Sequence, residues 1–172
     1  LRTILRTQNH SWQKSEDKGF HTRFQESEDG KIITEKSENG FSRVFRKNKE
    51  GQWTTEGPYG TILLENIGPN LFNVREPMGN GAFETTLYAP ARKVSEKFVG
   101  DGKGGSRRVD YTEEDLNGWR IHRIFDESGK CVQETEGQGY AIEKLVRDGK
   151  VLVDKTKSSN NKLININKVL TR

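Results

Sequence analysis

Apolar and polar residues alternate with a period of two along most of this chain. Phe83, Thr85 and Leu87 share one face of an expected strand, as do Trp119 and Ile121 on a later one. A period of two is the signature of β-strands. Six Asn-Gly or Asp-Gly pairs, which favour tight hairpin turns, separate such segments: Asp29-Gly30, Asn39-Gly40, Asn80-Gly81, Asp101-Gly102, Asn117-Gly118 and Asp148-Gly149. The pattern predicts antiparallel strands joined by hairpins.

One unit of this pattern recurs along the chain. A glycine, an aromatic residue and a charged alternating stretch lead to a second glycine in residues 19–30, 40–51 and 118–129. In the first two copies, Phe24 and Phe45 follow Phe20 and Phe41 by four positions. That even spacing places both rings of a copy on one strand face.

The fold class predicted is all-β, an antiparallel hairpin meander with at most one short helix. An open sheet, a sandwich-like sheet and a closed barrel all remain compatible with the spacing. Charges on both faces favour an exposed or single-layer sheet. Residues 1–172 form a single β-rich domain, with two related halves at about 10–56 and 82–156. Proline-containing residues 57–81 join the halves, and residues 157–172 form a basic C-terminal segment.

Two segments interrupt the strand pattern. In residues 90–100, Ala91, Val94 and Phe98 have helical spacing after Pro90, although Val94 and Phe98 suit a strand equally well. Residues 112–115 resemble a capping box followed by Asn117-Gly118, which predicts one short helical turn.

The composition points to an ordered protein with a small core. Hydrophobic residues make up 30% of the chain and charged residues 31%. The 29 basic residues nearly balance the 25 acidic ones, and 3 Trp, 4 Tyr and 8 Phe supply large apolar side chains. Disordered chains combine high net charge with few aromatics. We therefore expect a thin core, or a core completed by pairing with another copy.

Charge is concentrated at the C-terminal end. Seven basic residues lie between Arg147 and Arg172, against only Asp148 and Asp154. Such a segment is a candidate contact for nucleic acid, an anionic surface or acidic patches of the body, or it is a solubilising tail.

Cysteine use and targeting signals give limited information. Cys131 is the single cysteine, so it has no intrachain partner and is a candidate only for an interchain disulfide. No stretch approaches the ~20 apolar residues of a membrane span. The start at Leu1, without an apolar leader, suggests a processed protein or a fragment, and Asn9 begins a glycosylation sequon. We expect an extracellular or secreted location.

Candidate chemistry is sparse, and the pattern assigns no catalytic residue, metal or cofactor. Residues 100–105 match G-x-G-x-x-G, but a strand-like segment follows where a dinucleotide site requires a helix. Lys103, Arg107 and Arg108 make this loop a candidate anion site. His10, His21 and His122 lack metal-ligand spacing. A small nuclease or toxin domain using His21 or His122 remains an alternative.

A second alternative is a carrier of a small apolar ligand. Gly51-Gln52-Trp53 resembles the G-x-W motif near the start of lipocalins, although it lies well inside this chain. That resemblance implies a closed barrel with an apolar interior, which the charged strand faces oppose.

The function we predict is a non-enzymatic structural or interaction module. It self-assembles, or binds a protein partner, through the faces and edges of its sheet. The aromatic residues expected to anchor the binding face are Phe20, Phe24, Phe41, Phe45, Trp119 and Phe125.

Overall fold

The computed structural model describes residues 22–156, which form one antiparallel sheet of 13 strands. Each strand pairs with the next one along the chain, from β1 to β13, so the sheet is open. This confirms the all-β hairpin meander and resolves the choice between open sheet and barrel. The strands are β1 (Thr22–Glu26), β2 (Ile32–Ser37), β3 (Ser42–Lys47), β4 (Trp53–Gly57), β5 (Gly60–Gly68), β6 (Leu71–Gly79), β7 (Ala82–Tyr88), β8 (Arg92–Gly100), β9 (Ser106–Asp115), β10 (Trp119–Phe125), β11 (Cys131–Gln138), β12 (Lys144–Arg147) and β13 (Lys150–Asp154).

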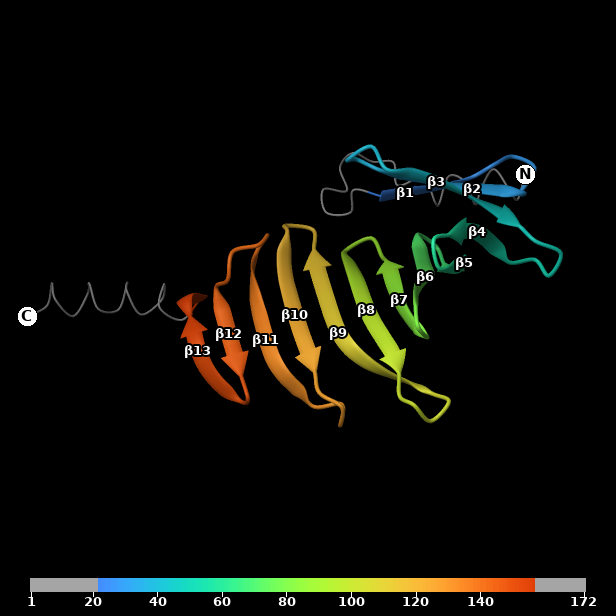
Figure 1. Cartoon of the computed structure of the whole chain (residues 1–172). Coiled ribbons are helices and arrows are strands. Elements are labelled where there is room, and N and C mark those ends of the chain that lie inside the picture. Colours follow the sequence, from blue (N-terminus) through green and yellow to red (C-terminus); the bar gives the residue numbers. More distant parts are fainter. Residues whose placement is uncertain (1–21, 157–172) are drawn as a thin grey trace, which may run out of the picture.

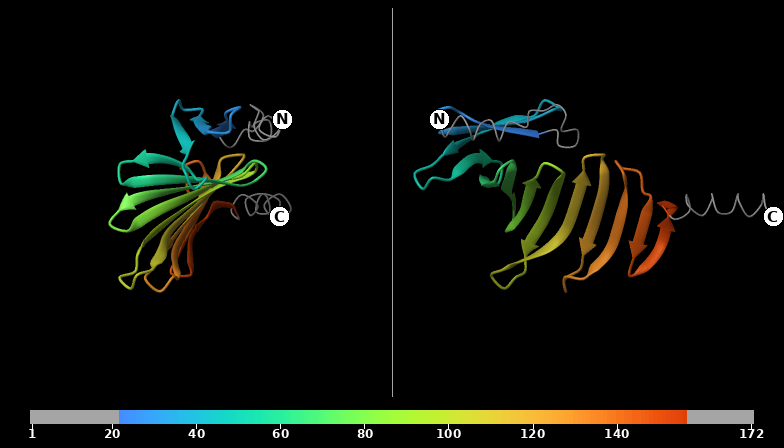
Figure 2. Two further views of the ribbon diagram at one scale, coloured as in Figure 1. Left: turned by 90° about the vertical axis from the view of Figure 1, so that its right-hand side faces the viewer. Right: turned by 180° about the vertical axis from the view of Figure 1, so that it is seen from behind.

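The sheet folds back on itself near its N-terminal end. Strands β3 and β4 share only two residue pairs, Arg46 with Thr54 and Lys47 with Trp53. Beyond this joint, β1–β3 form a second layer that runs in a different direction from the strands of the main sheet (Figures 1 and 2). Strands β9–β13 continue as a single layer. The molecule therefore has a two-layer end and a one-layer end.

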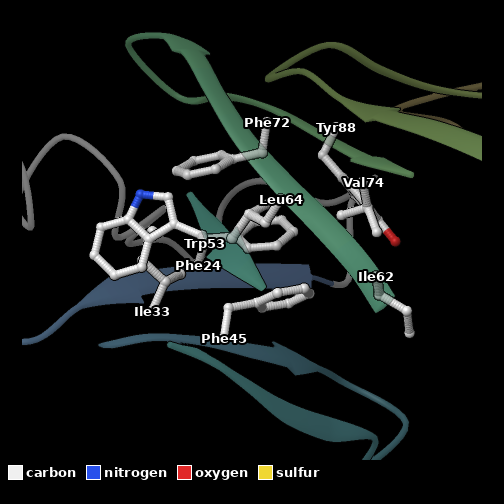
Figure 3. Packing of buried hydrophobic residues seen from close by; sticks show 9 residues of the cluster. All are labelled: Phe24, Ile33, Phe45, Trp53, Ile62, Leu64, Phe72, Val74 and Tyr88. Atoms are coloured by element: carbon white, nitrogen blue, oxygen red, sulfur yellow. The ribbon is translucent and has the colours of Figure 1, made fainter. Parts of the chain in front are cut away.

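The hydrophobic core lies between the two layers (Figure 3). The Phe24 ring of β1 stacks on Phe72 of β6, with ring centroids 4.5 Å apart, and meets Tyr88 of β7 edge-on at 5.1 Å. Burial of large aromatic rings is the main source of stability in so small a cluster. Its members are Phe24, Ile33, Phe45, Trp53, Ile62, Leu64, Phe72, Val74 and Tyr88.

The sequence changes character along this face where the second layer ends. Residues directly opposite each other on adjacent strands share a face, and one such row can be followed from β5 to β12. It reads Leu64, Val74, Thr86, Ser95, Thr112, His122, Thr135 and Leu145. The row is apolar under β1–β3 and polar over β7–β11. A polar face needs no covering layer, so on this side the sheet can continue beyond the second layer.

The predicted turns occur at the expected places. Asn80-Gly81 and Asp148-Gly149 both have positive φ at each residue, with values of 54°, 75°, 50° and 78° in chain order. Two consecutive positive φ angles are what a primed hairpin turn requires. These turns join β6 to β7 and β12 to β13.

Neither helical alternative is correct. Residues 92–100 form β8, so the strand interpretation of that segment holds. Residues 112–115 lie at the end of β9, where Thr112 pairs with both Ser95 and His122. Pairing on both sides outweighs the local helical signal. The Asp115 carboxylate instead accepts hydrogen bonds from the backbone of Asn117 and Trp119, at 2.8 and 2.9 Å, within the next turn.

The predicted domain organisation and the predictions for the two ends of the chain can be compared with the structure only in part. Residues 57–81 contain the last residue of β4 and the whole of β5 and β6, and sheet pairing runs through them without a break. The relatedness of the two halves stays a prediction. Phe20, His10, His21, Asn9 and residues 157–172 lie outside the described residues. Among residues 22–156, no helix has the length and apolar character needed to cross a membrane.

Candidate interaction groove

Three adjoining hollows lie along the face on which β1–β3 pack. The first, of about 620 Å³, lies at the joint between the two layers. It shares Glu84, Lys93 and Ser95 with the second, of about 340 Å³. The second shares Arg120 and His122 with the third, of about 190 Å³, over β10 and β11. Because neighbouring hollows share walls, they form one continuous surface, which we call the groove.

An ionic cluster occupies the end of the groove beneath β2 and β3. Arg43 Nε donates to Glu35 Oε1 at 3.1 Å, and Arg43 Nη1 donates to Glu76 Oε1 at 3.1 Å. The guanidinium lies 5.4 Å from the ring centroid of Phe41 and 5.2 Å from that of Phe45. A planar cation can make charge-assisted hydrogen bonds and stack on aromatic rings at once. Arg43 therefore connects the second layer to β6.

Glu35 is the most deeply buried ionisable side chain of this cluster. Its side chain is only 2% exposed and lies opposite Arg43 on the neighbouring strand. Burial raises the pKa of Glu35 above its ordinary value, while the nearby Arg43 and Lys93 lower it. The net direction is upward because desolvation of the carboxylate outweighs the attraction of its partners.

Tyr88 and Lys93 form the floor of the groove next to this cluster. The pair lies directly opposite on β7 and β8, with Lys93 Nζ 5.3 Å from the Tyr88 ring centroid. Burial raises the pKa of the Tyr88 hydroxyl, and the Glu35 carboxylate raises it further. The Tyr88 hydroxyl therefore stays protonated across the physiological range and can serve as a hydrogen-bond donor.

Opposite charges alternate across the open part of the groove. Glu84, Lys97 and Asp110 lie opposite one another on β7, β8 and β9. A parallel row places Lys93 opposite Glu114, and Glu114 opposite Arg120. Cross-strand pairs of opposite charge stabilise an antiparallel sheet. The same rows present both donors and acceptors to anything that lies in the groove.

His122 is part of this polar surface. Its Nε2 lies 2.8 Å from Asp110 Oδ2, and its side chain is 39% exposed. Thr112 and Thr135 flank it on the neighbouring strands. The contact with Asp110 orients the imidazole, and within residues 22–156 no hydrogen bond joins His122 to a nucleophilic side chain. Nuclease activity through His122 stays a prediction.

Five of the six aromatic residues expected to form a binding face belong to the described residues, and they do not share one exposed surface. Phe24 and Phe45 are fully buried in the core of the chain itself. Phe41, 48% exposed, lines the groove. Trp119 and Phe125 lie on the opposite face of β10, where Trp119 Nε1 donates to Glu136 Oε2 at 3.2 Å. Phe41 is thus the member of the set that a partner in the groove can reach.

The candidate anion loop connects β8 to β9. Asp101 Oδ1 accepts hydrogen bonds from the backbone N–H groups of Lys103 and Gly105, at 2.7 and 3.0 Å, which lowers the pKa of Asp101. A carboxylate of the loop therefore already uses these donors. Arg107 and Arg108 are neighbours in β9 and point to opposite faces. Arg108 binds Glu96 at 3.1 Å, so anion binding by the three residues together stays a prediction.

The remaining chemistry is limited in the part of the chain described. Residues 22–156 contain no group of three His, Cys, Asp or Glu side chains placed to hold a metal ion. Cys131 is a half-buried free thiol with Sγ 3.3 Å from the Gln133 carbonyl, and its interchain pairing stays a prediction. No protein-family model, curated protein or solved structure matches this chain.

Proposed function

We propose that this chain is a non-enzymatic interaction module that associates with a second polypeptide, in the first place another copy of itself, along the groove. The observation that carries the proposal is the continuity of the groove across the face of the sheet, from the two-layer end to β11. Hydrogen-bond donors, acceptors and opposite charges alternate along its walls. Such a surface can pair with the backbone and the charged side chains of an extended polypeptide. The exposed apolar residues Phe41 and Pro58 line its two-layer end.

The open end of the sheet supports association as well. Strand β13 is the last strand of the described sheet, and Val151 and Leu152 are 59% and 52% exposed on it. Ile142 and Tyr140 are also exposed nearby in sequence. Exposed apolar residues and a free strand edge are features of interaction surfaces.

A lipocalin-like carrier is not proposed. That alternative expects a closed barrel, whereas the described strands form an open sheet. Trp53 of the G-x-W tripeptide packs in the core between the two layers, 6% exposed. Its role in this chain is structural.

Light scattering at micromolar concentration tests the proposal. We expect the wild type to have a mass above the 19.6 kDa of one chain, because a second copy occupies the groove. Ser95→Trp, which fills the groove wall, should return the mass to that of one chain. Thr85→Trp, on the opposite face of neighbouring β7, is the matched control and should leave the mass unchanged. A single-chain mass for the wild type at every concentration contradicts self-association.

A further inference from the structure

The two-layer end of the groove has an excess of acidic side chains. Glu35, Glu56, Glu76 and Glu84 line this hollow, against the two cations Arg43 and Lys93. Arg43 is already bound to both Glu35 and Glu76. The excess makes this end attractive to a cationic partner segment.

Two of these carboxylates retain capacity to accept further hydrogen bonds. Glu56 Oε1 accepts a hydrogen bond from the Thr61 hydroxyl at 3.0 Å, in an exposed position. Glu84 Oε2 lies 4.0 Å from Lys97 Nζ, at the outer limit of an ion pair, and its side chain is 28% exposed. A carboxylate has about four acceptor positions, so both can receive an ammonium or guanidinium group.

Apolar wall residues accompany these acids. Phe41 and Pro58 line the same hollow as exposed residues, and the core residues Ile62 and Val74 contribute to its lining as well. Lysine and arginine bury their methylene stems against apolar surface while the charged group binds an acid. This end of the groove thus matches a segment that is both basic and apolar.

The chain itself contains such a segment. Residues 157–172 carry Lys157, Lys162, Lys168 and Arg172, with no Asp or Glu, and include Leu163, Ile164, Ile166, Val169 and Leu170. They follow directly after β13, at the other end of the strand order from the acidic hollow.

We propose that residues 157–172 of one copy dock in the acidic end of the groove of a second copy. This inference rests on the proposed function and names the segment that carries it out. A path to the hollow of the same copy would cross the six strand spacings from β13 to β7, about 29 Å. At about 3.3 Å per residue that path would take up roughly half of the segment, whereas a second copy can present the whole segment from the solvent side. Such head-to-tail contacts build closed rings or open chains of molecules.

A peptide titration tests the inference separately from the proposed function. The probe is a fluorescent synthetic peptide of residues 157–172. The receptor is the full chain carrying Lys157→Gln, Lys162→Gln, Lys168→Gln and Arg172→Gln, so that its own segment does not compete. We expect saturable binding, measured by anisotropy, that weakens as salt rises. Glu56→Gln with Glu84→Gln in the receptor should weaken binding by about tenfold or more, because two charge-assisted contacts are lost.

Matched variants and the mass in solution complete the test. Glu50→Gln with Glu127→Gln changes two exposed turn carboxylates away from the groove and should leave peptide binding unchanged. The receptor variant itself should have a single-chain mass while the wild type associates. Association of the wild type without peptide binding would overturn the inference and leave the proposed function standing. Peptide binding with a single-chain wild type would show that the segment occupies its own groove and would overturn the assignment to a second copy.

Discussion

Replacing Phe72 by alanine is expected to lower the free energy of unfolding by about 3–5 kcal/mol. Phe72 is fully buried, and its ring stacks on Phe24 with centroids 4.5 Å apart. It is therefore a main contact between β6 and the second layer. The cavity left by the ring cannot fill easily, because the neighbouring side chains belong to two layers held apart by their own backbones. Urea denaturation followed by tryptophan fluorescence measures the loss.

Phe83→Ala is the matched control for this prediction. Phe83 stacks on Phe98 with centroids 4.8 Å apart, but both rings lie on the sheet face opposite to β1–β3, which no strand of residues 22–156 covers. Removing one ring of such a cross-strand pair is expected to cost about 1 kcal/mol. Equal losses for Phe72→Ala and Phe83→Ala would contradict the assignment of the core to the joint between the layers.

Arg43→Met is expected to destabilise the fold strongly at neutral pH, by about 3–5 kcal/mol. The substitution leaves the Glu35 carboxylate buried without its guanidinium partner. Burial already raises the pKa of Glu35 in the folded state, and Arg43 opposes that rise. Without Arg43 the pKa should rise further, so the folded variant binds the Glu35 proton more tightly than the unfolded chain does.

The sign of the pH dependence follows from this linkage. In the unfolded chain Glu35 titrates near its ordinary pKa of 4.5. Between that value and the raised folded-state pKa, the folded variant holds a proton that the unfolded chain has lost, so stability falls as pH rises. The loss in free energy of unfolding caused by Arg43→Met should therefore be smallest below the pKa of Glu35 in the unfolded chain. It should be largest above the pKa of Glu35 in the folded variant.

Urea denaturation across acidic and neutral pH measures this difference. Arg43→Met combined with Glu35→Gln removes the buried charge together with its partner. This double variant should recover part of the lost stability at neutral pH and lose the added pH dependence. A destabilisation by Arg43→Met that is constant with pH, or that grows on acidification, would contradict the role assigned to Glu35.

The regular part of the fold was predictable because its determinants are local. Alternation and Asn-Gly or Asp-Gly turns depend on neighbouring residues, and pairs such as Asn80-Gly81 have the positive φ angles expected of them. The short helical turn at residues 112–115 was predicted wrongly for the opposite reason. Thr112 pairs with strands on both sides of β9, and pairing to β8 depends on residues well before the capping-box motif.

Less of the candidate site than of the fold could be predicted from the sequence. Glu35 and Arg43 lie on adjacent strands of one hairpin, so their contact follows from the turn at Gly40. The sequence signal for this contact is the arginine between Phe41 and Phe45. A charged side chain between two aromatic residues of one face needs an acidic partner when it is buried. The contact from Arg43 to Glu76 has no such signal, because it exists only where the sheet folds back between β3 and β4. The hollow of about 620 Å³ at the joint is likewise a product of that fold.

Site-specific photo-crosslinking at Phe41 tests most directly whether the groove holds another polypeptide. A photoreactive phenylalanine analogue at this half-exposed groove position should give a covalent adduct between two copies when the wild-type sequence is otherwise kept. The same analogue at Leu116, exposed in the turn before β10, is the control and should give none. A two-copy adduct from position 41 alone is the result predicted. If the analogue at position 41 gives no adduct under conditions where light scattering shows association, the groove is not the site of association.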